Sequence, residues 1–398
     1  MSLVERFGRH DAVVLSADRS SVLVDDELAL PRVWTNGAHP ADVSVLVSGL
    51  RAQLGQPVTV LRCLCSEPQP DGDTVHRCWQ AELHNPQAPL PLGFRWIPSE
   101  AFEISARLLA ERSDGAITDG REWERPGWAA AAHEWIKSKM PTVEAIEQIR
   151  CWEFSYVARV SSASGTHYFK ALPTSYGHEP PLTQLLAERH STLLPRVIAV
   201  DTQRRWMLTR AAKGVSLERR ITLEPWLRTV RDYAELQRTW ASRMAELRAV
   251  GCRDTNLPLH EFAWVEEAQR RLDHYELPRT IDHGDFWPSN VFVTRARGKI
   301  IDWTDAAIGH PFFSLVPMRL AYGFDRRRSN VQRLREAYLE PWGGARKLAA
   351  AFDLAQPLGA LYYAAKIEAL QAHNQWWLPR FVPWLEEIAN REAASLVW

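Results

Sequence analysis

The hydrophobic pattern of the sequence changes near residue 215, and this change constrains the fold more than any other feature. Before it, short apolar runs bounded by turn residues recur, among them "SVLVDD", "VTVLRCLC" and "RWMLTRA". Runs of this kind are typical of β-strands. From Val215 to the end, apolar residues recur at helical spacing, and a hairpin near residue 295 gives the only strand signal. The pattern predicts an α+β fold in which a small β-rich lobe precedes a helical lobe.

The chain has 398 residues, enough for two or three domains. One helix is expected among the N-terminal strands, in "HPADVSVLVSGLRAQLG", with Pro40 near its start and Gly55 closing it. The segment "WAAAAHEWIKSKM" is expected to be a helix that enters the next domain. We therefore expect an α+β domain over 1–112, a linker and helix over 113–140, a β-rich lobe over 141–213 and a helical lobe over 214–398.

Several long helices are expected in the helical lobe. The segment from Glu224 to Val250 predicts one continuous helix. Further on, "ARKLAAAFDLA" and "LGALYYAAKIEALQAH" predict two separate helices, and "WLEEIANREAAS" predicts another.

Composition and charge argue against several classes of partner. Lys plus Arg number 48, as do Asp plus Glu, so the net charge of zero gives no sign of bulk nucleic-acid binding. No secretory signal and no apolar run long enough to span a membrane is found. The five cysteines are an odd, scattered set, which predicts reduced thiols in a cytoplasmic protein. Neutral charge and 18 tryptophans fit a monomer or a homodimer equally.

Three of the cysteines lie near a histidine. Cys63 and Cys65 are two residues apart on one expected strand, and His76 and Cys78 are two apart on the next. If these strands pair antiparallel, the four side chains could share a face and bind zinc. Alternating inward residues of an ordinary hairpin explain the spacing as well, because free cysteine is commonly buried. Since the spacing is not that of a familiar zinc finger, the hairpin is the preferred interpretation.

The strongest functional signal is "HGDFWPSN", which ends at Asn290, followed by "IIDW", which contains Asp302. "VFVT" and "KIIDW" read as two short strands, so Asp285 and Asn290 lie on a loop before a hairpin and Asp302 leaves its second strand. Carboxylate and amide oxygens are hard ligands that suit Mg²⁺. Asn290 and Asp302 are therefore the candidate metal ligands, and Asp285 is placed to accept a proton from an attacking hydroxyl.

Phosphoryl transfer also needs positive charge at the phosphates of the nucleotide. Lys170, on the strand "HYFKAL", is the candidate for that contact. A glutamate on a nearby helix would hold this lysine, and Glu179 is preferred over Glu188.

From about residue 141 onward the chain resembles the aminoglycoside phosphotransferase family, which shares the bilobal protein-kinase-like fold and includes choline, homoserine and sugar kinases. The resemblance rests on "HGDFWPSN", "IIDW" and the following "WTDAAIGHPFFSL". It implies ATP and Mg²⁺ as cofactors and a small-molecule hydroxyl as phosphate acceptor. It implies Asp285 as the catalytic base, Asn290 and Asp302 as metal ligands, and Lys170 at the nucleotide phosphates. His283 would shape the loop.

The chain departs from the protein-kinase pattern where a glycine-rich loop would cover the phosphates, because "RCWEFSYVARV" has no glycine. Ser155, or backbone amides near it, is expected to act there instead. No Walker-type phosphate loop is present, which argues against a P-loop kinase. Taken singly, the Asp and Asn residues of the motif could be turn formers, and Lys170 could be a solvated strand residue.

The first 112 residues resemble a Nudix hydrolase domain in the order of their strands and helix. That family needs glutamates on its catalytic helix to hold divalent cations. Here Gly49, Ala52 and Gln53 stand at the matching places, so metal-dependent hydrolysis has no evident machinery. We expect a degenerate Nudix-like domain with a structural, substrate-capping or interaction role, or a generic α+β domain.

The expected acceptor is a small hydroxylated molecule: a sugar, an amino sugar, an aminoglycoside-type antibiotic or an amino alcohol. "AHNQWW" (372–377) could bind a sugar by hydrogen bonds and ring stacking, or could pack between helices. Two other functions stay open. A catalytically inactive kinase-like scaffold has no need of the intact acidic set, and a protein kinase is disfavoured because no "APE"-like segment follows Asp302.

Overall fold

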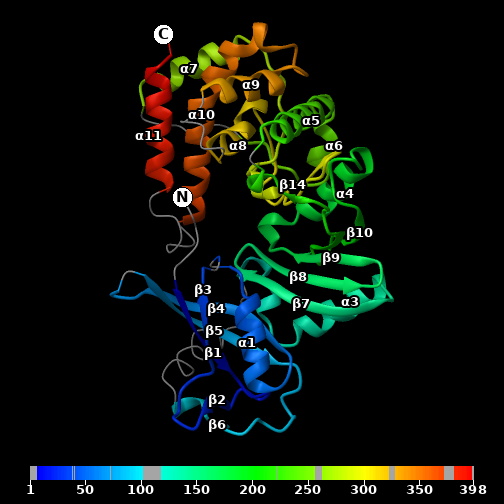
Figure 1. Cartoon of the computed structure of the whole chain (residues 1–398), viewed down its shortest axis with the longest axis vertical. Coiled ribbons are helices and arrows are strands. Elements are labelled where there is room, and N and C mark those ends of the chain that lie inside the picture. The colour runs from blue at the N-terminus through cyan, green and yellow to red at the C-terminus, as the bar shows by residue number, and fades with distance from the viewer. Residues whose placement is uncertain are drawn as a thin grey trace. The chain divides into compact units, whose positions relative to one another are not determined.

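The chain forms two compact units, drawn together in Figure 1. The first holds Met1–Gly177 and Ile198–Arg210, and the second holds His178–Val197 and Ala211–Trp398. The computed structural model describes residues 7–37, 39, 41–71, 73–101, 118–220, 222–255, 262–321, 328–371 and 381–396.

A four-stranded sheet opens the first unit, in the order β3 (Arg32–Asn36), β1 (Phe7–Val14), β5 (Thr74–Leu83) and β4 (Val58–Pro68). β1 and β5 run parallel, whereas the other neighbours are antiparallel. A separate antiparallel pair joins β2 (Ser21–Asp25) to β6 (Phe94–Pro98). The sequence did not predict β3, in which buried and exposed residues alternate over only five positions.

The predicted N-terminal helix is α1 (Ser44–Leu54), and it ends at Gly55 as expected. Gly55 has a left-handed backbone (φ 67°), and its N–H bonds to the carbonyl of Arg51. Glycine adopts this conformation without a steric cost, which makes it a common helix terminator.

A five-stranded sheet completes the first unit. Its order is β10 (Val197–Asp201), β11 (Trp206–Arg210), β9 (Gly165–Ala171), β8 (Ser155–Ser162) and β7 (Val143–Trp152). The expected strand that carries Lys170 is confirmed as β9, which forms a hairpin with β8, whereas β7 was not predicted. The predicted helix α3 (Trp128–Lys139) buries its tryptophans among the aromatic residues of this sheet.

One side-chain amide joins the four-stranded and the five-stranded sheet of this unit. Gln148 of β7 accepts a hydrogen bond from the N–H of Val60 (2.9 Å) and donates one to its carbonyl oxygen (2.7 Å). The register shifts beside both residues, in β4 after Val60 and in β7 after Gln148. Because a bulge interrupts a hydrogen-bond ladder, the amide supplies the donor and acceptor that Val60 needs. Side chains from both sheets, α1 and α3 form one hydrophobic cluster around this contact.

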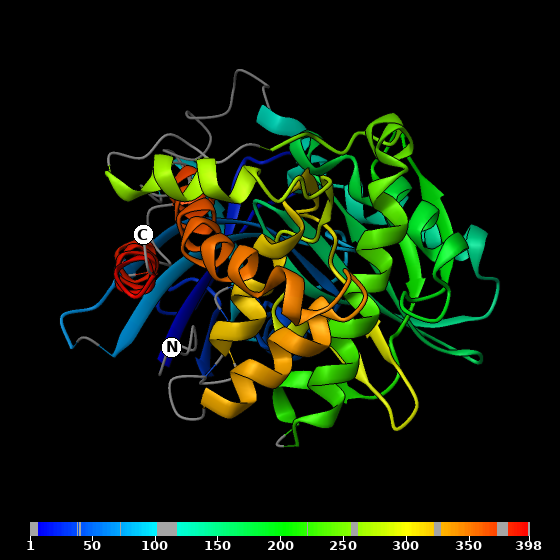
Figure 2. The same cartoon turned by 90° about the horizontal axis from the view of Figure 1, so that it is seen from above.

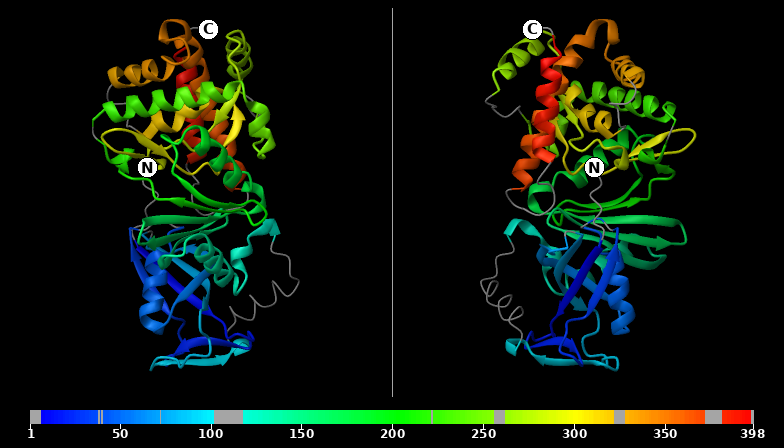
Figure 3. Two further views of the ribbon diagram at one scale, coloured as in Figure 1. Left: turned by 90° about the vertical axis from the view of Figure 1, so that its right-hand side faces the viewer. Right: turned by 60° about the vertical axis from the view of Figure 1, so that its left-hand side comes forward.

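The second unit is mainly helical (Figure 2). Its short strands are β12 (Val215–Ser216), β14 (Val291–Val293) and β15 (Gly298–Ile300) in one sheet, and β13 (Thr280–Asp282) with β16 (Ala307–Gly309) in another. Its helices are α4 (Glu179–Arg189), α5 (Glu224–Ala241), α6 (Met244–Ala249), α7 (Trp264–Asp273), α8 (Leu315–Ala321), α9 (Arg328–Leu339), α10 (Ala345–Gln371) and α11 (Phe381–Ala394). α10 and α11 lie side by side (Figure 3).

The α+β prediction, with strands preceding helices, is confirmed, but details of the helical part were wrong. The single helix expected from Glu224 to Val250 is interrupted between α5 and α6. The two helices expected near Pro357 are one continuous helix, α10. Proline removes only one hydrogen bond from a helix, and both halves of α10 bury leucines in the same cluster, so packing keeps them aligned. The strands β12, β13 and β16 are too short to show a periodic pattern.

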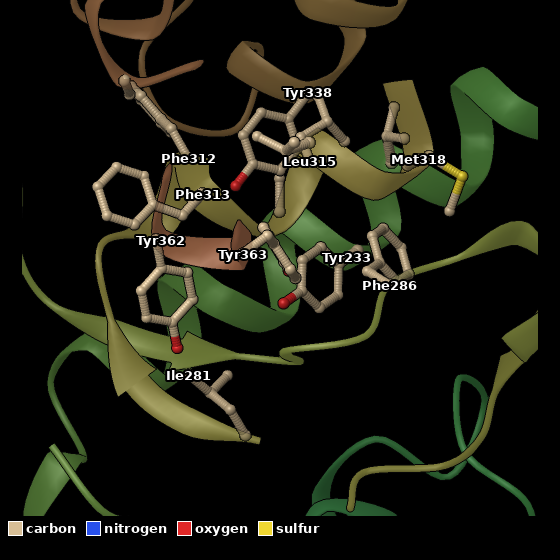
Figure 4. Packing of buried hydrophobic residues seen from close by; sticks show 14 of the residues in the cluster. Tyr233, Ile281, Phe286, Phe312, Phe313, Leu315, Met318, Tyr338, Tyr362 and Tyr363 are labelled. Atoms are coloured by element: carbon tan, nitrogen blue, oxygen red, sulfur yellow. The ribbon is translucent and has the colours of Figure 1, made fainter. Parts of the chain in front are cut away.

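Aromatic residues fill the core of the second unit (Figure 4). Tyr233 stacks on Phe286 with ring centroids 4.1 Å apart. The buried amide of Gln237 donates to the carbonyl oxygens of Ile281 (3.0 Å) and Pro311 (3.2 Å), and Tyr338 donates to its oxygen (2.5 Å). Because an unpaired polar group would be costly here, these bonds fix how α5 packs on β13. Among the described helices, none has the length and hydrophobicity needed to cross a membrane.

The burial of two histidines predicts that the free energy of unfolding decreases in acid. The Nδ1 of His10 accepts a hydrogen bond from Trp79 (3.0 Å), and that of His310 accepts one from the N–H of Phe312 (3.2 Å). Both rings must therefore be neutral, and burial, followed by nearby arginines, lowers their pKa values to about 4 and about 3. The unfolded state binds more protons below pH 6.5, so stability is complete above that pH and is lost as pH falls towards 4.

We expect the free energy of unfolding to decrease by up to about 1.4 kcal/mol per pH unit for each such histidine. Urea denaturation at pH 7.5, 5.5 and 4.5 measures this decrease. A midpoint that does not change between pH 7.5 and 4.5 would contradict the prediction.

Candidate functional site

The loop that follows β13 is organised by His283, which is fully buried. Its Nδ1 accepts a hydrogen bond from the N–H of Asp285 (3.3 Å), so its Nε2 carries the ring proton and donates to the carbonyl oxygen of Ile301 (3.0 Å). The ring also lies 4.5 Å from that of Trp303. Because Ile301 and Trp303 flank Asp302, this histidine links the two halves of the motif.

Gly284 lies against the segment that follows Asp302. It has a positive φ of 75°, and a Cβ at this position would lie 2.0 Å from the carbonyl oxygen of Asp305. Only glycine permits this approach. The contact holds Asp285 and Asp305 on neighbouring segments of backbone.

Asp285 and Asn290 are joined directly. The Nδ2 of Asn290 donates to the backbone oxygen of Asp285 (2.9 Å) and to its Oδ2 (2.8 Å). A short 3₁₀ helix, Pro288–Asn290, leads from the loop into β14 and carries Asn290. The backbone N–H of Ile301 bonds to the carbonyl oxygen of Asn290 (2.9 Å), which brings the amide next to the segment of Asp302.

Asp302 has a left-handed backbone (φ 64°), which is uncommon for a residue other than glycine. Its Oδ1 lies 2.5 Å from the hydroxyl of Thr304, and that hydroxyl lies 2.7 Å from Oε2 of Glu179. The single proton of that hydroxyl can be donated to only one of the two carboxylates at a time. Backbone strain of this kind is common at functional sites.

The carboxyl of Asp285 is buried among other charged side chains, and this changes its pKa. Burial raises the pKa of its carboxyl to about 7, with further contributions from Asp305 and Asp302. Lys366 and the hydrogen bond from Asn290 oppose that shift. A carboxylate with a pKa near neutrality is well suited to exchange a proton with a substrate.

Lys366 of α10 is a residue that the sequence analysis missed. Its Nζ donates to the carbonyl oxygen of Gly284 (2.6 Å) and lies 3.2 Å from Oδ1 of Asp305. It also lies 5.9 Å from the ring centroid of Tyr363, a cation–π distance. One lysine on an amphipathic helix gives no signal in the sequence, because such residues are usually solvated.

The residues of the motif fit Mg²⁺ by their chemistry. Asn290 offers an amide oxygen and Asp302 a carboxylate, and Mg²⁺ typically takes one or two protein oxygens together with water and substrate phosphates. Among the described residues, no group of three or more His, Cys, Asp and Glu side chains is arranged to hold a metal ion.

The other candidates are divided between the two units. Lys170 lies on β9, opposite Met207 and Val157, and Ser155 begins β8, where its Oγ accepts a hydrogen bond from Trp152 Nε1 (2.9 Å). In the second unit, Glu179 begins α4 and is fully buried. The alternative, Glu188, is exposed and bonds to Gln184 (3.3 Å). The tryptophan segment 372–377 lies outside the described residues.

The structure does not bring the four zinc candidates together. The register shifts between Cys63 and Cys65, and as a result Cys63 packs on the large cluster of the first unit and Cys65 on a smaller one. His76 is engaged elsewhere, because its Nε2 lies 2.9 Å from Oδ2 of Asp11. The ordinary hairpin explains the spacing.

Comparison with known proteins gives one assignment by sequence. The sequence model of the phosphotransferase enzyme family matches residues 128–351, more than half of the chain. The match begins within α3, earlier than the expected residue 141. A comparison with curated proteins gives no significant match.

Solved structures with a similar arrangement include three kinases of small molecules. APH(2")-IIia in complex with GDP and kanamycin is 15% identical, with 67% of this chain and 99% of that chain covered and a TM-score of 0.45. Choline kinase LicA from Streptococcus pneumoniae is 12% identical, with 68% and 99% covered and a TM-score of 0.48. An ethanolamine kinase from Plasmodium vivax is 10% identical, with 73% and 93% covered and a TM-score of 0.49.

The close packing of Gly284 generates a stability prediction. We expect Gly284→Ala to lower the free energy of unfolding, because the new methyl group adds a clash with Asp305 to the strain of a positive φ. Gly127→Ala is the matched control, since Gly127 has a similar positive φ (82°) but nothing within 4 Å of the added atom. Chemical denaturation should show a loss for Gly284→Ala that exceeds the control's by about 1–3 kcal/mol. Equal losses would contradict the packing.

Proposed function

The chain belongs to the phosphotransferase enzyme family, and from this premise we propose that it transfers the γ-phosphoryl group of ATP, with Mg²⁺, to a hydroxyl of a small molecule. The observation that carries the proposal is the bond between the Nδ2 of Asn290 and the carboxylate of Asp285, 2.8 Å long, beside the strained Asp302. Phosphoryl transfer depends on positioned groups and neutralised phosphate charge rather than on covalent chemistry. A fixed base beside oxygen ligands supports this reaction class.

Asp285 is proposed as the base. Its carboxylate is held by Asn290, and its pKa of about 7 leaves it able to accept a proton from an acceptor hydroxyl near neutral pH. The N–H of His283 donates to the hydroxyl of Tyr233, and its ring accepts from the N–H of Asp285, so the loop backbone is fixed up to the proposed base. Because a base must lie within hydrogen-bond reach of the proton that it takes, this fixed backbone contributes to catalysis through geometry.

Asn290 and Asp302 are proposed to hold Mg²⁺ through their side-chain oxygens. When bound, Mg²⁺ neutralises charge on the phosphates of the nucleotide. Lys170 is proposed to contact those phosphates and Ser155 to lie at their covering turn. Glu179, rather than the exposed Glu188, is proposed to hold Lys170, because it is buried and already bonded through Thr304 to the segment of Asp302.

The acceptor is proposed to be a sugar, an amino sugar, an aminoglycoside-type antibiotic or an amino alcohol. The acidic side chains of Asp285, Asp302 and Asp305 are opposed locally by Lys366. A net negative site is compatible with acceptors that carry amino groups as well as with neutral sugars once Mg²⁺ is bound. A panel of acceptors is therefore needed.

The first test is release of ADP with ATP and Mg²⁺ across these acceptor classes. We expect turnover with one class, and we expect Asp285→Asn to reduce kcat by about 100-fold or more, because the amide cannot take the proton. Thermal shift by ATP serves as the folding control, since Asp285 is not proposed to bind the nucleotide. An Asp285→Asn variant with full turnover would contradict its role as base. Absence of both turnover and ATP binding in the unsubstituted chain would favour the inactive scaffold.

A second prediction concerns Lys366. We expect Lys366→Met to lower kcat while the KM for ATP changes little, because the Gly284 carbonyl and Asp305 lose their shared cation. Lys366→Arg should recover part of the activity, since it keeps the charge and the donors. Lys347→Met, at an exposed position on the same helix, is the control. Equal kcat for the two methionine variants would show that Lys366 does not position the loop.

A further inference from the structure

Two cysteines lie opposite each other on the hairpin of β4 and β5, in the first unit and outside the phosphotransfer motif. We propose that Cys65 and Cys78 form a thiol–disulfide modification site, which closes into a reversible cross-strand disulfide when a small-molecule disulfide reacts with the chain. The inference is independent of the phosphotransferase function.

The strand register places the two cysteines directly opposite each other. β4 and β5 are antiparallel, and Cys65 is the cross-strand partner of Cys78. Directly opposed residues of an antiparallel pair have Cα atoms about 4.5–5.5 Å apart, which lies within the range that a disulfide bond spans. Their thiols are within hydrogen-bond reach of each other. The bond could therefore form without a rearrangement of the strands.

The bulge in β4 places Cys65, and not Cys63, opposite Cys78. Because the register shifts between Cys63 and Cys65, only Cys65 packs with Cys78 in the small apolar cluster on that face of the sheet. Cys63 belongs to the other face, and its thiol donates to the carbonyl oxygen of Cys65 (3.1 Å). Burial raises its pKa to about 12, so it stays protonated.

The two thiols of the pair differ in ways that assign their roles. Cys65 is partly exposed, whereas Cys78 is buried. A hydrogen bond from the Cys78 thiol lowers the pKa of Cys65 to about 6, and that same bond, with burial, raises the pKa of Cys78. Thiolates are the reactive form of cysteine. Cys65 is therefore the attacking group and Cys78 the resolving group.

The reaction balances with oxidised glutathione as the disulfide. The Cys65 thiolate attacks one glutathione sulfur, the glutathione disulfide bond breaks, and one glutathione leaves as a thiolate that takes up a proton. The Cys78 thiol then loses its proton to solvent and attacks the Cys65 sulfur, which releases the second glutathione. The chain loses two hydrogens and is oxidised, and the glutathione disulfide is reduced to two thiols.

The test uses the full chain equilibrated in mixtures of reduced and oxidised glutathione, followed by alkylation and peptide mapping by mass spectrometry. We expect a peptide that links Cys65 to Cys78, with Cys151 and Cys252 alkylated only after unfolding because both are buried. The link should disappear on addition of excess reduced glutathione. Cys63→Ser is the matched control, and it should form the same link.

Two single variants separate the roles. Cys78→Ser should retain one glutathione on Cys65, because the resolving thiol is gone, and Cys65→Ser should leave Cys78 unmodified. Since Cys65 is partly exposed, the latter variant is expected to fold. A link between Cys63 and Cys65, glutathione retained on Cys65 in the unsubstituted chain, or no reaction at Cys65 would each overturn the proposal.

Discussion

The arrangement of the motif depends on the close approach of Gly284 to the backbone of Asp305. No side chain fits between these two segments, so the loop that carries Asp285 and the segment that carries Asp302 must pack backbone to backbone. His283 adds a hydrogen bond to Ile301, and Lys366 adds one to the Gly284 carbonyl. A buried cluster of aromatic residues lies behind the loop, with Tyr233 stacked on Phe286. The backbone packing therefore brings the carboxylates together, and the bond from Asn290 then orients that of Asp285.

This packing has an electrostatic consequence. Asp285, Asp302 and Asp305 are brought close enough for their charges to raise the pKa of Asp285, and burial adds to the effect. Like charges held together are costly unless a cation or a proton compensates them. Lys366 supplies part of that compensation within the chain. The negative charge that Lys366 does not compensate is the physical reason why we propose a Mg²⁺ site and a proton-accepting role for these carboxylates.

The sequence predicted the features that depend on residues close together in the chain. It missed those that depend on contacts between distant residues. Asp285, Asn290 and Asp302 lie within twenty residues in a recognisable order, so the motif, the hairpin and the family could be predicted. Lys366 and Thr304 could not, because each acquires its role only through tertiary contact. The interruption of α5 and the continuity of α10 through Pro357 were also missed, since packing overrides local helix preference. A bulge in β4 separates Cys63 from the other zinc candidates, and no pattern of residues in the sequence predicts a bulge.

The central claim is that Asn290 and Asp302 hold a magnesium ion on a bound nucleotide. Titration calorimetry of ATP with and without Mg²⁺, on the unsubstituted chain and on Asp302→Asn, tests it most directly because no acceptor is needed. The account predicts that Mg²⁺ tightens ATP binding to the unsubstituted chain and that this tightening is lost in the variant, while binding of ATP without Mg²⁺ is retained. Equal tightening by Mg²⁺ in both proteins would contradict the assignment of the metal site.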